Sequence, residues 1–396
     1  MLDTQVDIAE LERIFSSGVY TKRDVQIVSG QGARLVDAAG RTYIDCVSGH
    51  GATNLGHGHP AIVSAIQQQA ATLIHCPEMF LNATRAHYQA ALCAAAGMAR
   101  VFLCNSGAEA IEGALKIARL VTGRPRIIAA MRGFHGRTLG ALSVTWQPAY
   151  RDPFEPLLPE IVHVPFNAVE PLAAALNGTV AAVLVEPVQG EGGVIPAQDG
   201  YLREVAAMCR ANGSLLILDE VQTGFGRTGW LFAHQREGVQ PDLLCLAKSS
   251  ANGLPLGAVL LAEGIGPLPP GVHGSTFGGN PVACAAGLAV LDVLQNQQPD
   301  LIARARTLGE AALAHLREHL PPTTVREVRG RGFMIGIELR GKVAPVLAAL
   351  QERGVLALPA GRTVLRLLPP LVIAEEDLWT AVATIEEVLS DATGSL

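Results

Sequence analysis

Asp219 and Glu220 end an apolar run within 214–218, whose residue types predict a buried β-strand. A carboxylate at that place is costly unless a partner compensates its charge. One suitable partner is a cationic heteroaromatic nitrogen, because Asp219 would keep such a ring protonated and able to accept electrons from a substrate carbanion. Taken alone, Asp219 fits a helix N-cap or a salt bridge at least as well.

Lys248 follows a second apolar run, 243–247, further along the chain. Partial burial beside a cation lowers the pKa of a lysine, which is the condition for chemistry through an imine. A single lysine at a strand end is more commonly a surface residue whose stem packs on apolar neighbours. The pairing of Asp219 with Lys248 at adjacent strand ends favours the chemical interpretation.

The segment 100–121 predicts a strand, a glycine turn at 106–108 and a helix with one apolar face. Free N–H groups and the helix dipole at such a turn make a site for an anion. Ser106 and Glu109 also fit a capping box, which would form with or without a ligand. We expect both interpretations to apply.

The loop 133–138 follows another strand and carries Phe134 and Arg137. Phe134 offers a flat ring that could stack on a cofactor, and the guanidinium of Arg137 could bind a carboxylate through two hydrogen bonds. An aromatic residue in a loop core beside a surface arginine explains the loop equally well in isolation.

Two patterns that suggest other ligands are rejected. The glycines of 224–229 match a dinucleotide-binding pattern, but no helix start follows and the acidic residue expected about 20 residues later is missing. His57 and His59 lack a third ligand nearby, while His315 and His319 fall one helical turn apart on a charged face that is expected to be exposed. No metal site is therefore expected.

The elements that must position these residues belong to an α/β fold with a mostly parallel sheet flanked by helices. Between about 101 and 261, short apolar runs alternate with polar or glycine-rich turns and helix-like stretches. Residues of chemical interest follow five of the six predicted strands, as an active site at the carboxyl ends of the strands requires. The predicted strands are 100–104, 126–130, 181–185, 214–218, 243–246 and 258–262.

Both ends of the chain are expected to build a smaller α+β domain. A hairpin is predicted within 33–46, and 281–396 is interpreted as two long helical stretches around strands at 333–339 and 364–368. The basic run 326–331 is interpreted as a solvated edge of that domain. The expected division is 1–50 for an N-terminal segment that joins the small domain, 51–280 for the large domain and 281–396 for the C-terminal small domain.

Composition favours a small-molecule ligand or a protein partner. A formal net charge of −6 without long runs of like charge argues against a nucleic acid and against an anionic membrane. The acidic start of the chain lacks the parts of a signal peptide, and no apolar run is long enough to span a bilayer. Seven scattered cysteines fit reduced thiols, so a cytoplasmic protein is expected.

In order and spacing, these segments resemble the class III (ornithine-type) aminotransferases of fold type I, which use pyridoxal 5′-phosphate (PLP), over essentially the whole chain. The resemblance implies that Lys248 carries PLP as a Schiff base and that Asp219 pairs with the pyridine nitrogen. Gln222 would hydrogen-bond the phenolic oxygen, and Phe134 would stack on the ring. The residues that the resemblance assigns to the phosphate are Ser106, Gly107 and Ala108.

Two further segments resemble family segments with known contacts. One contacts the cofactor of the neighbouring subunit, and the other distinguishes the two substrates. The segment 274–281 resembles the one whose threonine, here Thr276, reaches the phosphate of the neighbouring subunit, so an obligate homodimer is expected. Glu191 and Arg366 resemble a switch pair, in which the glutamate neutralises the arginine for one substrate and releases it for the α-carboxylate of glutamate.

Within that class, the chain is most similar to enzymes that act on N-blocked semialdehydes, the acetylornithine and [LysW]-aminoadipate-semialdehyde aminotransferases of arginine and lysine biosynthesis. Segments such as 18–20 and 142–146 look more like the [LysW] type. Arg137 and Ser275, with Tyr20 nearby, would then hold the carboxylate end of the blocked substrate. The resemblance implies an ω-aminotransferase that takes the amino group of glutamate and releases 2-oxoglutarate. An acidic amino-group carrier protein would be a partner if it is the blocking group.

Three alternatives stay open. They are an ornithine- or 4-aminobutyrate-type aminotransferase, an aminomutase of the glutamate-1-semialdehyde type, and a PLP-binding protein without turnover. The switch pair argues against the second, and the complete set of charged site residues argues against the third. Ile111 and the loop 249–253 depart from the usual family pattern without removing a catalytic group.

Overall fold

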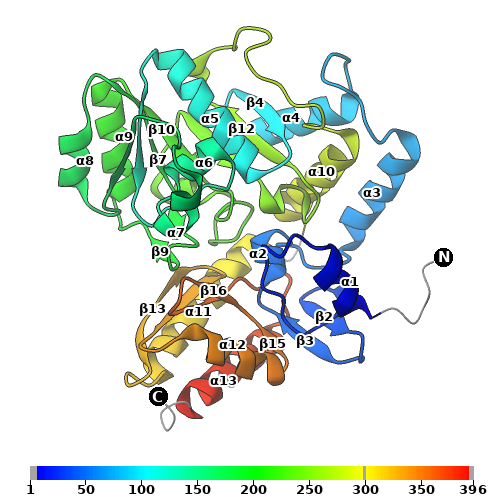
Figure 1. Ribbon diagram of the computed structural model, residues 1–396. Helices are drawn as coiled ribbons and strands as arrows, with labels where there is room; N and C mark the ends of the chain where they lie inside the picture. The colour runs from blue at the N-terminus through cyan, green and yellow to red at the C-terminus, as the bar shows by residue number, and fades with distance from the viewer. Residues whose placement is uncertain (1–6, 298–299, 392–396) are drawn as a thin grey trace.

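A seven-stranded sheet lies at the centre of the larger unit of the fold (Figure 1). The computed structural model describes residues 7–297 and 300–391. In their order across the sheet, the strands are β4 (Arg100–Cys104), β12 (Gly257–Leu261), β11 (Leu243–Leu246), β10 (Leu215–Asp219), β7 (Val180–Val185), β5 (Arg126–Ala130) and β6 (Ile161–Val164). β12 runs antiparallel to both of its neighbours, and the other paired strands are parallel.

The mostly parallel α/β sheet expected from the sequence is confirmed. The six predicted strands are present, with ends that differ by at most one residue. β6 was not expected, because it has four residues and one of them is His163. Alternate strand residues face opposite sides of the sheet: Ile127 and Ala129 lie in one hydrophobic cluster, and Ile128 lies in another.

Helices cover both faces of this sheet, which is why its strands are almost wholly apolar (Figure 1). α5 (Gly107–Thr122) and α6 (Leu139–Val144) pack in the cluster on one face. The helices that contribute to the cluster on the other face are α3 (Pro60–Thr72), α4 (Ala83–Ala96), α8 (Val169–Ala175), α9 (Tyr201–Asn212) and α10 (Pro281–Asn296).

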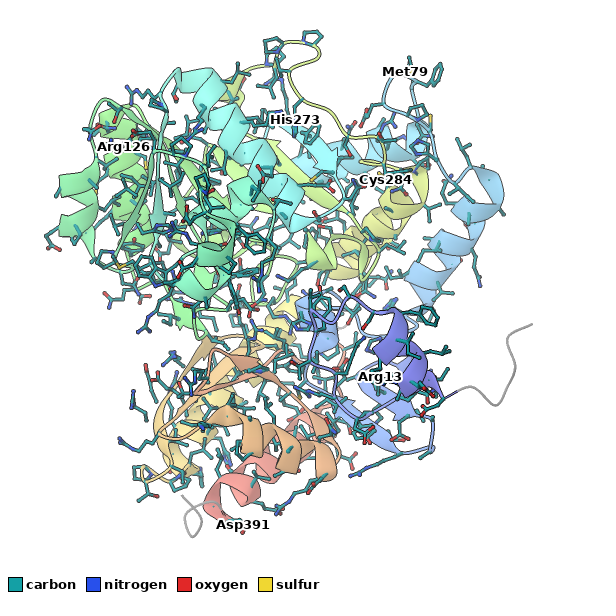
Figure 2. All side chains as sticks on the ribbon, in the orientation of Figure 1. Arg13, Met79, Arg126, His273, Cys284 and Asp391 are labelled. Carbon is teal, nitrogen blue, oxygen red and sulfur yellow. The ribbon has the colours of Figure 1, made fainter. Side chains whose placement is uncertain are left out.

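α10 confirms that the apolar run near its start is a buried helix, and Cys284 marks it in Figure 2. It packs against α3 and α4 within the larger unit. The division at 50/51 and 280/281 stays a prediction, and these contacts favour a second boundary after α10. The outermost parts of the expected small domain, 1–6 and 392–396, lie outside the described residues.

Segments from both ends of the chain meet in the smaller unit, at the bottom of Figure 1. One sheet joins β1 (Ile27–Gln31), β2 (Arg34–Asp37) and β3 (Thr42–Asp45) to β15 (Val355–Leu356), and it contains the predicted hairpin. The other sheet has the order β13 (Val325–Arg331), β14 (Met334–Leu339), β17 (Val364–Leu367) and β16 (Leu358–Ala360). The helices here are α11 (Leu301–His319), α12 (Val343–Glu352) and α13 (Glu375–Asp391).

Two expectations for this part of the chain were wrong. The two long helical stretches of 281–396 are four helices, α10 to α13. The basic run is strand β13, which is an edge strand as expected and exposes Arg326, but Arg329 in it is buried rather than solvated. Its guanidinium contacts Glu327 of the same strand and Glu338 of the neighbouring strand β14, each at 2.6 Å, and these two carboxylates compensate its charge.

The remaining described elements are short. They are α1 (Ile8–Phe15), α2 (Ser48–Gly51), α7 (Pro148–Arg151), β8 (Val188–Gln189), β9 (Ile195–Pro196) and four 3₁₀ turns, η1 (Asp152–Phe154), η2 (Ala233–Glu237), η3 (Lys248–Ala251) and η4 (Glu263–Ile265).

None of the helices described by the structure is long and apolar enough to cross a membrane.

Candidate active site

A cavity of about 470 Å³ opens beyond the carboxyl ends of the central strands. Asp219 ends β10, Lys248 follows β11 after one residue, and Ser106 follows β4. Side chains that are far apart in the sequence therefore meet at one edge of the sheet. The predicted residues that line this cavity are Ser106, Gly107, Ala108, Phe134, Glu191, Asp219, Gln222 and Lys248.

Lys248 begins the turn η3 with a backbone φ of +43°, a left-handed conformation that is strained for a residue with a side chain. Burial lowers the pKa of its amine, and the nearby charge of Arg366 acts in the same direction. Glu191 and Asp219 oppose this shift without reversing it. An amine with a lowered pKa is more often neutral, which is the form that attacks a carbonyl or accepts a proton.

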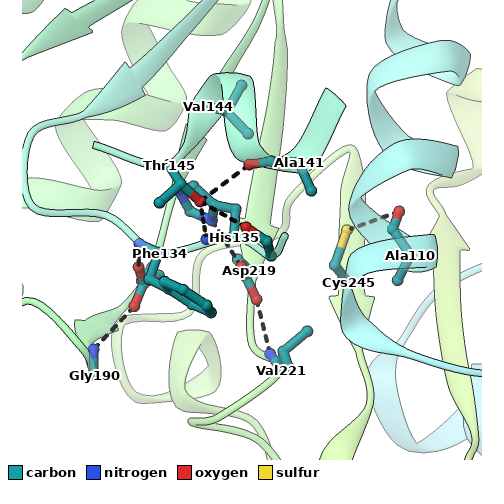
Figure 3. A network of polar contacts seen from close by, with 12 residues as sticks. Ala110, Phe134, His135, Ala141, Val144, Thr145, Gly190, Asp219, Val221 and Cys245 are labelled. Carbon is teal, nitrogen blue, oxygen red and sulfur yellow. Dashed lines mark hydrogen bonds and ion pairs between the residues drawn. The ribbon is translucent and has the colours of Figure 1, made fainter. Parts of the chain in front are cut away.

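Asp219 is held between two partners, as Figure 3 shows. One carboxylate oxygen is 2.7 Å from Nδ1 of His135, and the other accepts the backbone N–H of Val221 at 3.0 Å. Burial works against a charge on His135, but its contact with Asp219 raises the pKa of the imidazole above its ordinary value. Asp219 therefore faces the cavity with the imidazole of His135 behind it.

Glu186 is a second buried carboxylate of the site, and we did not predict it. Its two oxygens accept the backbone N–H groups of Phe134 at 2.8 Å and Gly190 at 2.9 Å (Figure 3). Burial raises the pKa of this carboxyl to about 7. The signal in the sequence was its place directly after the apolar strand β7, the same signal that identified Asp219.

The start of α5 forms the turn at which we expect an anion to bind. Ser106 Oγ accepts the N–H of Glu109 at 3.2 Å, so this half of the predicted capping box is present. The carboxylate of Glu109 instead accepts the N–H of Asn105 at 2.8 Å, one residue earlier than expected. At Gly107, a Cβ atom would lie 2.7 Å from a methyl carbon of Val221, so the turn leaves no room for a side chain.

Arg366 and Glu191 meet beside this cavity, with Nη1 and Oε1 2.5 Å apart. Arg366 is fully buried, whereas about a third of the Glu191 side chain is exposed. Burial alone would raise the pKa of Glu191, but the guanidinium lowers it below its usual value. Gln222 lies 3.3 Å from the same nitrogen of Arg366. Glu191 is therefore the more accessible partner of this ion pair.

Arg137 is exposed, and its guanidinium carbon lies 3.5 Å from the centre of the Tyr150 ring. Tyr150 also meets Phe134 edge to face, with ring centres 6.2 Å apart. The loop thus presents a guanidinium close to the ring that lines the cavity. Tyr150 was missed from the sequence, since nothing in the spacing relates α7 to this loop.

Besides Arg366 and Arg137, whose contacts are described above, three more predicted residues are absent from the cavity lining. Thr276 is exposed, and Tyr20 is 78 % exposed in the segment before β1. Ser275 approaches the site only through Asn105, whose side-chain amide donates to its hydroxyl at 3.2 Å. Within the described part of the chain, these residues do not complete the site that the other residues build.

The groups of the cavity fit the chemistry of PLP. A buried amine with a lowered pKa, a carboxylate backed by an imidazole and a helix start with free N–H groups match its aldehyde, pyridine nitrogen and phosphate. Nε2 of His135 has no partner among the described residues, and it is buried beside Asp219. The site is therefore polar where PLP is polar, and Phe134 supplies an apolar wall.

Comparison with known proteins agrees with this geometry. Residues 16–389 match the family model for class-III aminotransferases. An acetylornithine aminotransferase from Methanothermobacter thermautotrophicus is 45 % identical over 97 % of this chain and 99 % of its own length. A [LysW]-aminoadipate semialdehyde transaminase from Deinococcus radiodurans is 46 % identical, over 96 % of this chain and 89 % of its own.

A solved structure extends the likeness to three dimensions. The ornithine aminotransferase of Toxoplasma gondii, with PLP partly occupying its active site, superposes with a TM-score of 0.93 at 36 % identity. The match covers 97 % of this chain and 93 % of that one. Fold, cavity and sequence thus agree, and the chain belongs to the class-III aminotransferase family: it is a transaminase whose cofactor is PLP.

Proposed function

We propose that this transaminase moves the amino group of glutamate to the ω-aldehyde of an N-blocked amino-acid semialdehyde. The observation that carries the proposal is the ion pair of Arg366 with the accessible Glu191 beside the cavity. An arginine that can be either neutralised or freed suits two substrates of different charge at one position. Relatives named for acetylornithine and for [LysW]-aminoadipate semialdehyde support arginine or lysine biosynthesis as the setting.

Each charged residue has a distinct task in this proposal. Bound PLP supplies a conjugated ring that stores the electrons of a substrate carbanion. Lys248 Nζ would hold the cofactor between turnovers and, once free and neutral, would accept and return the proton that the substrate carbon releases. Asp219 keeps the ring nitrogen protonated. Ser106, Gly107 and Ala108 hold the phosphate at the start of α5, and Gln222 holds the phenolic oxygen.

The two arginines would divide the recognition of carboxylates. When the Glu191 side chain moves away, Arg366 binds the α-carboxylate of glutamate. When Glu191 pairs with Arg366 again, the pair has no net charge and the uncharged end of the semialdehyde substrate can bind there. Arg137, with Ser275 and Tyr20, holds the carboxylate end of the blocked substrate. Whether the block is an acetyl group or an acidic carrier protein is decided by competing N-acetylornithine against the carrier-linked substrate in one assay.

We infer that the working enzyme is a cytoplasmic homodimer. Support comes from Thr276, which is exposed in one chain although the family resemblance assigns it to a cofactor phosphate. A second copy that brings Thr276 to the neighbouring cavity would complete each site. The seven cysteines are all free thiols, as a reducing compartment requires.

A two-step spectral assay tests the proposed function. Glutamate added to the yellow, PLP-loaded protein should abolish the visible absorption band and release 2-oxoglutarate. Adding N-acetylglutamate semialdehyde should then restore the band and form N-acetylornithine. An unchanged spectrum would leave only a PLP-binding protein, and conversion of a semialdehyde without glutamate would indicate an aminomutase. Faster restoration by unblocked glutamate semialdehyde or succinic semialdehyde would instead favour an ornithine- or 4-aminobutyrate-type enzyme.

A further inference from the structure

Three side chains with metal-binding atoms converge on the smaller unit, outside the catalytic cavity. His315 and His319 lie one turn apart on α11, and Glu386 projects from α13. One ligand atom from each lies within 4.8 Å of the other two. The sequence placed only the two histidines together, and the fold adds the third group.

The two imidazoles are already arranged as a chelating pair. Their rings are stacked, with centres 4.0 Å apart and planes inclined by 16°. Nδ1 of His319 is 2.9 Å from the backbone oxygen of His315, a contact in which the nitrogen donates its proton. Nε2 of His319 is then the unprotonated nitrogen and is available to a metal. A hydrogen bond from the other ring nitrogen to a carbonyl commonly orients a metal-binding histidine.

Glu386 closes the third side of the cluster. Its Oε1 lies 2.7 Å from Nε2 of His315, and the two side chains are 26 % and 35 % exposed. The ring of Trp379 meets His315 edge to face at 5.4 Å, which limits rotation of that imidazole. The helices beneath are packed together through buried residues such as Leu316 and Ile385. The ligands therefore stand on a rigid base with solvent access on one side.

We propose that His315, His319 and Glu386 bind one zinc-like divalent transition-metal ion and so tie α13 to α11. Two imidazoles and a carboxylate form a ligand set that suits Zn²⁺, with water in the fourth position. Tetrahedral zinc needs ligand atoms about 3.4 Å apart. The longest separation between the ligand atoms, within 4.8 Å, must shorten, and the contact of His315 with Glu386 must lengthen. Movement of the exposed His319 and the half-buried Glu386 side chains achieves both.

The competing explanation is that Glu386 and His315 form only a hydrogen-bonded ion pair. The two explanations differ in the part that His319 plays. An ion pair does not use its Nε2, whereas a metal site depends on it. Since metal binds the folded arrangement of two helices that are distant in sequence, occupancy must also raise the thermal stability of the chain.

The test uses PLP-loaded protein stripped with a chelator and then dialysed against micromolar ZnCl₂. The expected result is one tightly held zinc ion per chain and a rise in Tm that the chelator reverses. His319→Gln and Glu386→Gln should each weaken zinc binding at least tenfold and remove the rise. His87→Gln, an exposed histidine on α4, is the matched control and should behave like the parent protein.

Absence of stoichiometric zinc uptake, or equal uptake and equal Tm shift in the His319→Gln protein, would overturn the proposal. Transamination rates should be the same with and without zinc, because none of the three ligands lines the catalytic cavity. This activity measurement also confirms that the variants are folded.

Discussion

Lys248 and Glu186 show the same physical effect on groups of opposite charge. Burial favours the neutral form of each, so the pKa of the amine falls and that of the carboxyl rises to about 7. Glu191 behaves differently, because its direct contact with Arg366 outweighs burial and favours the charged form. The cavity therefore keeps its ion pair at the rim and groups that can exchange protons inside.

Glu186→Gln should flatten the dependence of stability on pH. The folded-state pKa near 7 lies above the ordinary glutamate value of 4.5, so between these pH values the folded chain holds a proton that the unfolded chain has lost. Stability must fall as pH rises through this window, by up to about 3 kcal/mol from this group. Chemical unfolding of cofactor-free protein at pH 5, 6 and 7 measures the difference between the two slopes.

Glu112→Gln is the matched control for that comparison. Its carboxylate also accepts two backbone N–H groups, those of Gly140 and Ala141, but outside the catalytic cavity. This variant measures how much the free energy of unfolding falls when a carboxylate that accepts hydrogen bonds is replaced by an amide. Parallel stability curves for the parent and the Glu186→Gln protein would contradict a raised pKa at Glu186.

Tyr150→Leu should weaken binding of the blocked substrate without damaging the chemical step. The tyrosine ring lies 3.5 Å from the guanidinium of Arg137, a cation–π contact worth about 0.5–2 kcal/mol. We expect KM for the blocked semialdehyde to rise roughly 2- to 30-fold with little change in kcat. Tyr150→Phe keeps the ring and should keep KM near the parent value.

Arg137→Leu separates this positioning effect from the proposed function itself. If its KM rises and that of Tyr150→Leu does not, Tyr150 has no positioning role. If neither variant changes KM, Arg137 does not bind the substrate and that part of the proposed function fails.

At the scale of elements, the site depends on how strands end. β10, β11 and β4 each deliver a functional residue within two positions of their last residue, and η3 does so through a strained backbone at Lys248. α5 contributes through its first turn, where close packing on Val221 requires Gly107. Short turns on a covered sheet hold these groups more firmly than long loops would.

Gly107→Ala should lower the affinity for PLP because the new methyl group would overlap Val221. The added Cβ would lie 2.7 Å and 3.0 Å from the two methyl carbons of Val221, so either the turn or the valine must move. Overpacking of this kind costs about 1–3 kcal/mol, which corresponds to a roughly 5- to 150-fold loss of PLP affinity. Titration of cofactor-free protein with PLP, followed by absorbance, measures the loss.

The double variant Gly107→Ala/Val221→Ala should recover most of the affinity, because it removes the opposing methyl groups. Val221→Ala alone shows the effect of the smaller side chain. Failure of the double variant to recover would place the cause in the backbone of the turn and not in the contact with Val221.

Strand ends were predictable because they depend on local patterns. An apolar run followed by a charged residue identified Asp219 and Lys248, and a glycine turn before an amphipathic helix identified Ser106. What depends on contacts between distant segments was not predictable. Tyr150 beside Arg137 and Glu338 beside Arg329 both required the fold, since spacing along the chain relates neither pair.

At the scale of the whole molecule, Arg227 links the two units. It is fully buried in the turn after β10, with no described carboxylate within 4.0 Å. Its guanidinium donates to Asn54 Oδ1 at 2.5 Å and to the backbone oxygens of Phe333 and Pro369 in the smaller unit. The switch pair also crosses this junction, because Glu191 belongs to the loop after β8 and Arg366 to β17.

Arg227→Met should destabilise the folded chain by about 2–5 kcal/mol, because it leaves buried oxygens without donors. Arg227→Lys should recover little of this, since a single ammonium cannot reproduce the planar set of donors. Thermal unfolding of the three proteins measures both effects. Arg353→Met removes a more exposed arginine from the surface of the smaller unit and serves as the control. A Tm shift no larger than that of this control would contradict a structural role for Arg227.

The segment around Thr276 lies in a region of exposed apolar side chains. Met79 and Leu81 are 82 % and 104 % exposed, and Phe277 is 62 % exposed; Met79 stands at the outer edge of the molecule in Figure 2. The ring of Phe277 meets His75 at 5.5 Å, so the two segments are adjacent. An exposed apolar surface beside a residue that the resemblance assigns to a phosphate is the arrangement expected of a shared site.

Mixing two inactive variants tests whether the site is shared. Lys248→Ala removes the catalytic amine, and Thr276→Asp places a negative charge where the phosphate of a neighbouring subunit would lie. In a hybrid dimer, the cavity of the Thr276→Asp chain keeps its own Lys248 and receives an unchanged Thr276 from its partner. Random association makes half of the dimers hybrid, each with one intact site, so roughly a quarter of the parent activity should appear. Activity that stays at the level of the separate variants, after exchange of subunits has been verified by differently tagged chains, would show that each chain builds its site alone.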